Sequence, residues 1–317
     1  MFYLSRIELN ELTKRFGPLM AVDHLSISIE GGEVFGLLGP NGAGKTTTVR
    51  MLACLISPSE GSAKVGGHDI ATEPMKVRAM VGILTENPSL YERLTVHENM
   101  DFFAQAYGLS DAQGRQDRIR ELLDFFELWE RRNDKVGKLS KGMKQKLAIA
   151  RTLVHKPSIL LLDEPTAGLD PESAKGIRDF VASLSQRDNH TVLLCTHHLE
   201  DAERLCDRVM IVNRGRCVIV GTPEELQDRI AGRPKLQVTL KKLDQSLVQV
   251  VKEIEHVREV YVDKDAANMV IAVDDLSETT PEIVGRVVRA GGMVLSVNTL
   301  RPSLEEAYLK LVRAENS

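Results

Sequence analysis

Cysteine is scarce in this sequence, and its four copies offer no paired chemistry. No two of Cys54, Cys195, Cys206 and Cys217 have the C-x-x-C spacing of a zinc or redox site. The first ten residues lack the basic and then apolar pattern of a secretory signal. We therefore expect reduced thiols in a cytoplasmic protein and no zinc site of standard spacing.

Long apolar segments and an excess of basic charge are also lacking. No apolar run approaches the roughly 18 residues that a membrane helix needs, so we do not expect the chain to span a membrane. The formal net charge of -4 excludes the global basic field that attracts nucleic acid or anionic lipid. With 317 residues, 43% of them hydrophobic, the chain has the length of one large globular domain and one smaller domain.

The hydrophobic pattern of the first two thirds predicts an α/β domain. Alternating residues near Ile7 and Ile29 indicate half-buried strands, as in an antiparallel sheet. Continuous apolar runs at 34–38, 158–162 and 191–195 indicate strands buried on both faces, which is typical of a parallel sheet covered by helices. Helical periodicity from Thr95 to His155, opened by a capping-box pattern, predicts a helical insert at about 95–156.

The remaining third predicts a separate α+β domain. We expect one large domain at 1–227, which contains the motifs described below, a linker at 228–234, and an accessory domain at 235–317. Strands at 236–240, 257–262, 269–273 and 294–297 alternate with helices at 246–256 and 281–290, which is the β-α-β-β-α-β order of a ferredoxin-like unit. A last amphipathic helix would carry Leu304, Ala307, Tyr308, Leu311 and Val312 on one face.

The strongest motif is a phosphate-binding loop of the form G-x-x-x-x-G-K-[ST]. It comprises Gly39, Pro40, Asn41, Gly42, Ala43, Gly44, Lys45, Thr46 and Thr47. A buried strand precedes it and a helix is predicted after it, so backbone N–H groups can converge on a phosphate. Lys45 would supply a charge to the β- and γ-phosphates and the Thr46 hydroxyl would bind Mg2+. The sequence therefore predicts MgATP binding.

Two carboxylates end the second buried strand, at Asp163 and Glu164. The carboxyl ends of strands are where open α/β sheets bind ligands. Asp163 suits the Mg2+ shell, and Glu164 suits orientation or deprotonation of the water that attacks the γ-phosphate. Together with the phosphate loop, they predict an ATP-hydrolysing enzyme.

The segment Leu139-Ser140-Lys141-Gly142-Met143-Lys144-Gln145 resembles the signature of ATP-binding cassette (ABC) transporter subunits. The resemblance extends from about Ile7 to Gly221, and no guanine-reading N-K-x-D motif is present. It implies that Phe16 stacks on adenine and that Val22 also contacts the nucleotide. It also implies that Glu86 takes the glutamine-loop position, beside the metal and the reacting water, and that His197 contacts the γ-phosphate.

The resemblance further implies that one chain holds two half-sites. Ser140 is predicted to cap the helix that runs to about Lys156, so that its hydroxyl and the following N–H groups form an anion site. In the family, Ser140, Lys141, Gly142 and the D-loop residue Asp170 act on ATP held by the opposite subunit. Hydrolysis would then need a head-to-tail homodimer with two bound ATP molecules.

Two positions depart from the family pattern. Glu86 replaces a glutamine, and its extra carboxylate would tighten metal binding or shift its pH dependence. Lys141 replaces the first signature glycine, and it either adds positive charge toward the γ-phosphate or points to solvent.

The whole layout is similar to the ATPase subunits of ABC-2 type exporters, which power a separate membrane permease. The resemblance places the permease contact at Pro88–Leu94, with Leu90 and Tyr91 either exposed for that contact or packed on the helical insert. It implies a peripheral protein at the cytoplasmic face of the membrane. The accessory domain would stabilise or regulate the dimer, or be a passive appendage.

Two alternative functions agree less well with the sequence. A soluble ABC ATPase that acts on nucleic acid or ribosomes would be expected to carry two cassettes and a charged linker, or a basic balance, and this chain has neither. A nucleotide sensor without hydrolysis would not need Glu164 and His197.

Overall fold

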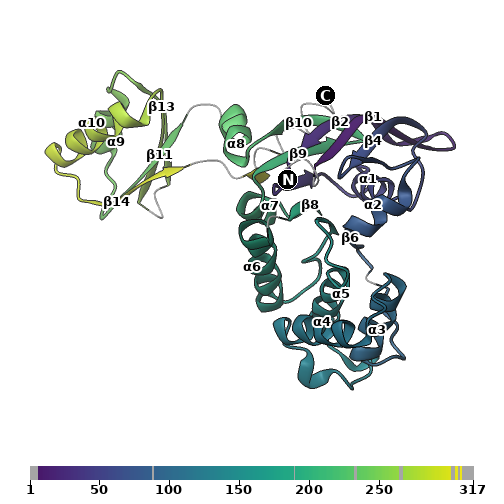
Figure 1. Cartoon of the computed structure of the whole chain (residues 1–317). Coiled ribbons are helices and arrows are strands. Elements are labelled where there is room, and N and C mark those ends of the chain that lie inside the picture. Colours follow the sequence, from purple (N-terminus) through teal and green to yellow (C-terminus); the bar gives the residue numbers. More distant parts are fainter. Residues whose placement is uncertain are drawn as a thin grey trace. The chain divides into compact units, whose positions relative to one another are not determined.

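The computed structural model describes residues 6–87, 89–188, 190–231, 234–263 and 267–300, together with 304, 305 and 308. The chain divides into two compact units, Met1–Pro223 and Glu224–Ser317 (Figure 1). Helix α8 (Pro223–Ala231) begins at this division, so the chain is helical through the start of the predicted linker at 228–234. Positions 232 and 233 of that linker lie outside the described residues, and the domain boundaries stay a prediction.

A six-stranded sheet forms the centre of the first unit, in the order β10-β9-β3-β8-β7-β6. Its strands are β3 (Val34–Leu38), β6 (Val81–Leu84), β7 (Ile159–Asp163), β8 (Thr191–Thr196), β9 (Arg208–Asn213) and β10 (Arg216–Gly221). Neighbours pair in parallel except β9 with β10. Every residue of β3, β7 and β8 is buried, as their continuous apolar runs predict.

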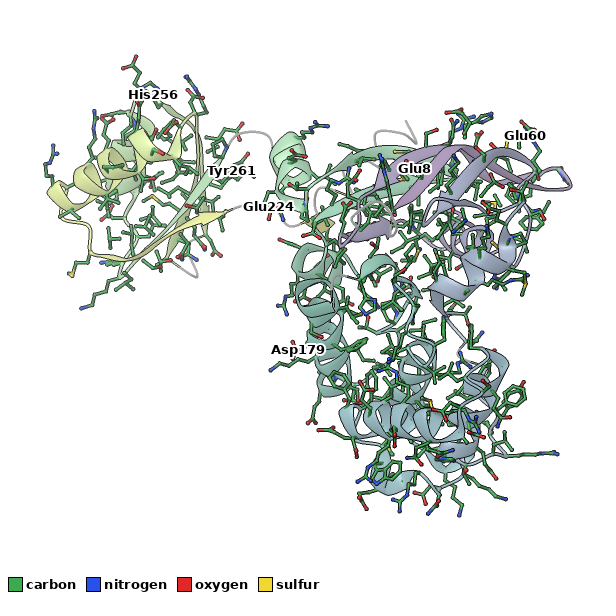
Figure 2. The ribbon with its side chains drawn as sticks, viewed as in Figure 1. Glu8, Glu60, Asp179, Glu224, His256 and Tyr261 are labelled. Atoms are coloured by element: carbon green, nitrogen blue, oxygen red, sulfur yellow. The ribbon has the colours of Figure 1, made fainter. Side chains whose placement is uncertain are left out.

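An antiparallel sheet in the order β2-β1-β4-β5 lies at the N-terminal end of the same unit. Its strands are β1 (Ile7–Phe16), β2 (Leu19–Ile29), β4 (Glu60–Val65) and β5 (His68–Asp69). Glu8 on β1 and Glu60 on β4 mark it in Figure 2. Residues of this sheet share one hydrophobic cluster with β3, β7, β8 and helix α1 (Lys45–Leu52), so the core joins the two sheets around α1.

The predicted helical insert is present. It contains α3 (Val96–Ala106), α4 (Ala112–Phe125), two 3-10 turns (Trp129–Arg131 and Val136–Lys138) and α5 (Lys141–Thr152). Thr95 and Glu98 form the predicted capping box at the start of α3. Helix α5 ends at Thr152, earlier than the predicted Lys156, because the amides of Val154 and Lys156 bond carbonyl oxygens three residues back and no longer continue the α-helical pattern. Helices α2 (Pro74–Met80), α6 (Pro171–Asp188) and α7 (Leu199–Leu205) complete the unit.

The second unit has the predicted β-α-β-β-α-β order. Its elements are β11 (Lys235–Leu240), α9 (Gln245–Lys252), β12 (Val257–Asp263), β13 (Asn268–Val273), α10 (Leu276–Arg289) and β14 (Val294–Leu300). The antiparallel sheet order is β12-β13-β11-β14, and exposed Tyr261 marks β12 in Figure 2. The predicted start of α10 at Pro281 is wrong: Asp275 accepts from the amides of Ser277 and Glu278 and starts the helix at Leu276.

The predicted terminal helix cannot be followed along its apolar face. Of its five named residues, Ala307, Leu311 and Val312 lie outside the described residues, while Leu304 and Tyr308 are described as helical. Within the described part of the chain, no helix combines the length and apolarity needed to cross a bilayer.

The tight packing of neighbouring atoms around Gly82 provides a test of how closely the core is packed. A Cβ at this position of β6 would lie 2.6 Å from the Thr152 carbonyl oxygen and 2.8 Å from Leu160 Cδ2. We predict that Gly82→Ala lowers the free energy of unfolding by about 1–3 kcal/mol through overpacking, measured by urea denaturation. Gly176→Ala on α6 is the control, because its Cβ would meet open space and alanine should stabilise the helix by roughly 0.5–1 kcal/mol. Equal effects of the two variants would contradict this account.

Candidate functional site

The loop between β3 and α1 has the shape of a phosphate cradle, and its glycines are required by that shape. Gly42 and Gly44 have φ of 82° and 102°, a region that other residues rarely adopt. A Cβ on Gly44 would overlap the Ala21 carbonyl oxygen, and one on Gly39 would overlap that of Val212. The loop therefore turns tightly into α1, whose first amides point out of the helix N-terminus.

Lys45 is buried beneath this loop. Its Nζ donates to the Gly39 carbonyl oxygen at 2.6 Å and to that of Pro40 at 3.2 Å. The same Nζ lies 3.9 Å from Glu164 Oε1. The ammonium is thus held by backbone oxygens, at the place where the loop and the end of β7 meet.

A cavity of about 400 Å³ opens over the loop. It is lined by Phe16, Leu19, Ala21, Asn41, Gly42, Ala43, Gly44, Lys45, Thr46, Thr47, Glu86, Glu164, Ala167 and His197. Phe16 is 47% exposed, so it is not a core aromatic but a wall of this cavity. The cavity therefore opens directly onto the phosphate cradle, with the exposed Phe16 ring in its wall.

Val22, which the family resemblance places among the nucleotide contacts, is not a lining residue of the cavity. Val22 is fully buried, and its Cγ2 would lie 3.4 Å from a Cβ on Gly44, which places it under the loop. Leu19, Ala21 and Ala167 line the cavity. Sequence reasoning missed these three small or apolar residues because nothing in their chemistry distinguishes them from core residues.

The half-buried Thr46 and the buried Asp163 form a pair next to the loop. The Thr46 hydroxyl donates to Asp163 Oδ2 at 2.7 Å. The other carboxylate oxygen, Oδ1, is buried and has no hydrogen-bond partner among the described residues. Burial raises the pKa of Asp163 above its ordinary value, opposed by the Thr46 hydrogen bond and reinforced by the negative charges of Glu164 and Glu86. An orphaned carboxylate oxygen in this position fits a site for a divalent cation.

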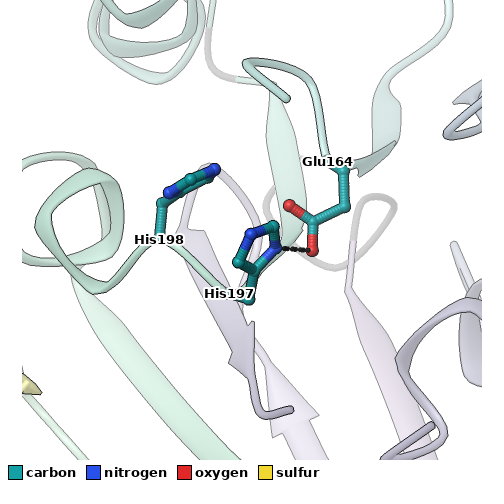
Figure 3. Close-up of side chains that lie close together, drawn as sticks. All are labelled: Glu164, His197 and His198. Atoms are coloured by element: carbon teal, nitrogen blue, oxygen red, sulfur yellow. Dashed lines mark hydrogen bonds and ion pairs between the residues drawn. The ribbon is translucent and has the colours of Figure 1, made fainter. Parts of the chain in front are cut away.

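Glu164 and His197 meet at the ends of two neighbouring strands (Figure 3). His197 Nδ1 lies 2.8 Å from Glu164 Oε1, and the Thr196 hydroxyl donates to Glu164 Oε2 at 3.3 Å. Glu164 has φ 51°, and its amide donates to the Cys195 carbonyl oxygen at 2.8 Å. This uncommon backbone conformation turns the Glu164 carboxylate toward β8 and His197.

The predicted signature and D-loop residues do not line this cavity in the described part of the chain. None of Ser140, Lys141, Gly142 and Asp170 is among the residues that line the cavity. Ser140 caps α5 by accepting from the Met143 amide at 3.2 Å, as predicted. Asp170 accepts from the amide and the hydroxyl of Ser173 at 2.9 and 2.7 Å, which lowers its pKa.

Lys141 lies against the D-loop of its own chain. A Cβ on Gly168 would overlap the Lys141 ammonium, and one on Gly142 would overlap the Ser173 hydroxyl. Gln145 of the same helix donates to the Pro165 carbonyl oxygen at 2.8 Å. The signature helix and the segment after Glu164 therefore pack on each other, and Lys141 is exposed beside Gly168.

Fold and site together define a phosphate-loop ATPase of the ABC type. The ABC transporter family model matches residues 22–167. A second family model, that of the C-terminal domain of ATP-binding proteins like DrrA1-3, matches residues 221–312.

Individual relatives agree with these matches, two of them over nearly the whole chain. The chain is 33% identical to the linearmycin resistance ATP-binding protein LnrL of Bacillus subtilis, over 96% of this chain and 97% of that protein. It is 36% identical to the daunorubicin resistance ATP-binding protein DrrA3 of Streptomyces coeruleorubidus, over 97% and 96%. The ABC transporter ATP-binding protein NatA of Bacillus subtilis is 40% identical over 70% of this chain and 92% of its own length.

Solved structures share the fold of the first unit. A dimeric ATP-binding cassette in a post-hydrolysis state, bound to ADP and Pi, superposes with a TM-score of 0.63 at 28% identity, covering 68% of this chain and 98% of that one. The ATP-binding subunit of an ABC transporter gives a TM-score of 0.65 at 32% identity, covering 72% and 94%. The chain belongs to the ABC transporter family, as the DrrA-like ATPase subunit of an ABC exporter.

The loop geometry predicts the effect of two alanine substitutions on nucleotide binding. Gly44→Ala would place a Cβ onto the Ala21 backbone, so we expect nucleotide affinity to fall by far more than tenfold. Gly42→Ala meets only open space and bears only the left-handed strain of about 1–2 kcal/mol, so it should lose roughly tenfold. Binding of a fluorescent ATP analogue measures both, with Gly176→Ala as control. Equal affinities for Gly42→Ala and Gly44→Ala would contradict the requirement for close approach.

Proposed function

We propose that two copies of this chain close head to tail around two ATP molecules, and that this cycle powers export through a separate membrane permease. The observation that carries the proposal is the incomplete cavity: residues 140–142 and Asp170 do not line it among the described residues. A capped helix N-terminus at Ser140 is suited to an anion that another copy supplies. Two of the similar solved structures, both of the same bacterial cassette, are dimers, which supports the pairing of two copies.

Within one half of the site, each predicted residue has a distinct role. Glu164 would orient the attacking water and accept its proton, and its hydrogen bonds with His197 and Thr196 aim the carboxylate. His197 would then contact the γ-phosphate and Lys45 would offset the charge that develops on it. Phe16 would stack on the adenine ring.

Thr46, Asp163 and Glu86 would hold Mg2+. The fit rests on the unpartnered Asp163 Oδ1, the adjoining Thr46 hydroxyl and an exposed Glu86 that lines the cavity. When bound, Mg2+ neutralises charge on the β- and γ-phosphate oxygens. Glu86 brings a full negative charge where the family has an amide, so the site should hold its metal more tightly.

The dimeric mechanism predicts how activity depends on concentration. The ATPase rate per mole of chain should rise with protein concentration and fall at least about a hundredfold in Glu164→Gln, which keeps the side chain's size but cannot accept a proton. Glu164→Gln should also form a stable dimer with ATP but not with ADP, measured by light scattering after size-exclusion chromatography. A concentration-independent rate together with a monomeric Glu164→Gln protein would refute the shared site.

An aromatic surface beside the segment 89–94 supports the permease contact; Pro88 lies outside the described residues. Tyr91 is 47% exposed and Phe102 48%, and their ring centroids lie 5.2 Å apart. The Tyr91 ring also stacks on that of Phe103, with 5.9 Å between the ring centroids. Tyr91 is therefore both packed on the helical insert and partly exposed to solvent. The fully buried Asn99 side chain bonds both the amide and the carbonyl of Tyr91, at 2.9 and 3.0 Å, which presents the ring on a rigid backbone.

We further propose a peripheral location at the cytoplasmic face of the membrane and a cargo of the drug-resistance class. Support comes from relatives named for resistance to linearmycin and daunorubicin, which match nearly the whole chain. The chain's own residues do not choose a compound, because the permease makes the cargo contacts. The ferredoxin-like unit matches the DrrA1-3-like C-terminal domain, and we assign it a role in dimer stability or regulation.

Tyr91 provides the test of the permease contact. We expect Tyr91→Ala to lower the fraction of the chain that sediments with membranes of its own cells by several fold, because the exposed ring is lost. Its ATP affinity should stay unchanged. Phe125→Ala is the control, since Phe125 is 58% exposed on α4 and packs on Phe126 and Phe180 instead. Equal membrane association of wild type and Tyr91→Ala would count against this surface.

A further inference from the structure

A second histidine lies beside the proposed catalytic pair. Glu164, at the end of β7, and His197 and His198, between β8 and α7, each turn one ligand atom toward the others, and these atoms all lie within 4.8 Å of one another (Figure 3). The rings of His197 and His198 are 4.1 Å apart between centroids. Among the residues that the structure describes, no other group of three His, Cys, Asp or Glu side chains meets this spacing.

The donor set is that of a transition-metal site. Two imidazole nitrogens and one carboxylate oxygen, with further positions left to water, are ligands that Zn2+ takes in open sites. Mg2+ prefers oxygen donors, and the residues proposed for it, Thr46, Asp163 and Glu86, are a different set. We propose that Glu164, His197 and His198 bind Zn2+ when no nucleotide is present.

The surroundings allow the three side chains to close on an ion. Donor atoms around a tetrahedral zinc lie roughly 3.3 Å apart, so no pair of ligand atoms has to change its separation by more than about 1.5 Å. The hydrogen bond between His197 Nδ1 and Glu164 Oε1, 2.8 Å long, gives way to the ion, and its proton is released to solvent. The Glu164 side chain is 9% exposed and accepts from the Thr196 hydroxyl, while both histidines are exposed. The His198 amide donates to the Thr196 hydroxyl at 2.9 Å, which anchors its backbone at the same point.

One charge opposes the ion. The Lys45 ammonium lies 3.9 Å from Glu164 Oε1, and it stays there because the Gly39 and Pro40 carbonyl oxygens hold it. Like charges repel at this range, so zinc binds here more weakly than in a closed structural site. Binding is therefore reversible and open to chelators.

Zinc at this position occupies the two side chains proposed for hydrolysis. With Glu164 and His197 bound to the ion, neither is free to meet the attacking water or the γ-phosphate, so zinc inhibits the ATPase. This consequence rests on the roles given to both residues under the proposed function, whereas the binding itself does not. His198 takes no part in the proposed reaction and reports on the metal site alone.

Calorimetry of the full-length, nucleotide-free protein with ZnCl2 tests the binding. We expect one zinc per chain in the wild type and an affinity at least about tenfold weaker in His198→Ala, because one of three protein ligands is lost. His256→Ala, which removes a histidine of the second unit, is the matched control and should bind as the wild type does. Circular dichroism checks that each variant is folded. Absence of zinc binding in the wild type, or equal binding by wild type and His198→Ala, overturns the proposal.

The ATPase assay separates the two ideas. Free zinc is set with a metal buffer, since ATP itself binds the ion, and each variant is compared with its own zinc-free rate. We expect inhibition of the wild type, reversal by a chelator, and at least about tenfold more zinc for the same inhibition of His198→Ala. ATP is kept below its KM, so that nucleotide-free protein is present to bind zinc. Under that condition, zinc binding that depends on His198 but leaves ATP hydrolysis unchanged would support the metal site and refute the proposed roles of Glu164 and His197.

Discussion

Three parallel strands lie side by side in the order β3-β8-β7, and the site depends on this adjacency. Parallel neighbours end at the same edge of a sheet, so whatever follows each strand is brought together there. The phosphate loop follows β3, Glu164 follows β7, and His197 follows β8. Each strand is buried along its whole length, so the strands cannot slip without exposing apolar residues. The core thus sets the positions of chemical groups far apart in the chain.

One cation, Lys45, and three carboxylates, those of Glu86, Asp163 and Glu164, gather at this edge of the sheet. Lys45 stands near Glu164, while Asp163 is buried with one oxygen unpartnered and a raised pKa. Such an arrangement is costly without a ligand, because a buried carboxylate loses its hydration. A divalent cation and a phosphate chain would satisfy the same groups, which is why they are better suited to a ligand than to stability alone.

Strain and close approach also concentrate here. Glu164 has a positive φ without being glycine, and Gly44 allows the loop to touch the Ala21 backbone. Away from this edge, the helical insert carries the Ser140 helix and the aromatic surface at Tyr91 on one set of packed helices. The hydrogen bond from Gln145 to the Pro165 carbonyl oxygen joins that insert to the segment after Glu164.

The sequence by itself determined the features whose residues are contiguous or evenly spaced: the phosphate loop, the capped signature helix, the buried strands and the β-α-β-β-α-β order. These follow from local backbone rules and from the period of the apolar pattern. The end of α5 at Thr152 and the start of α10 at Leu276 differed from the prediction, because three-residue turns follow Thr152 and an aspartate cap precedes Leu276. Only the tertiary structure joined Glu164 to His197, placed Val22 under the loop, put Leu19, Ala21 and Ala167 on the cavity wall and brought His198 to the pair. Those contacts depend on strand order and on single φ values, which no local pattern of residues reveals.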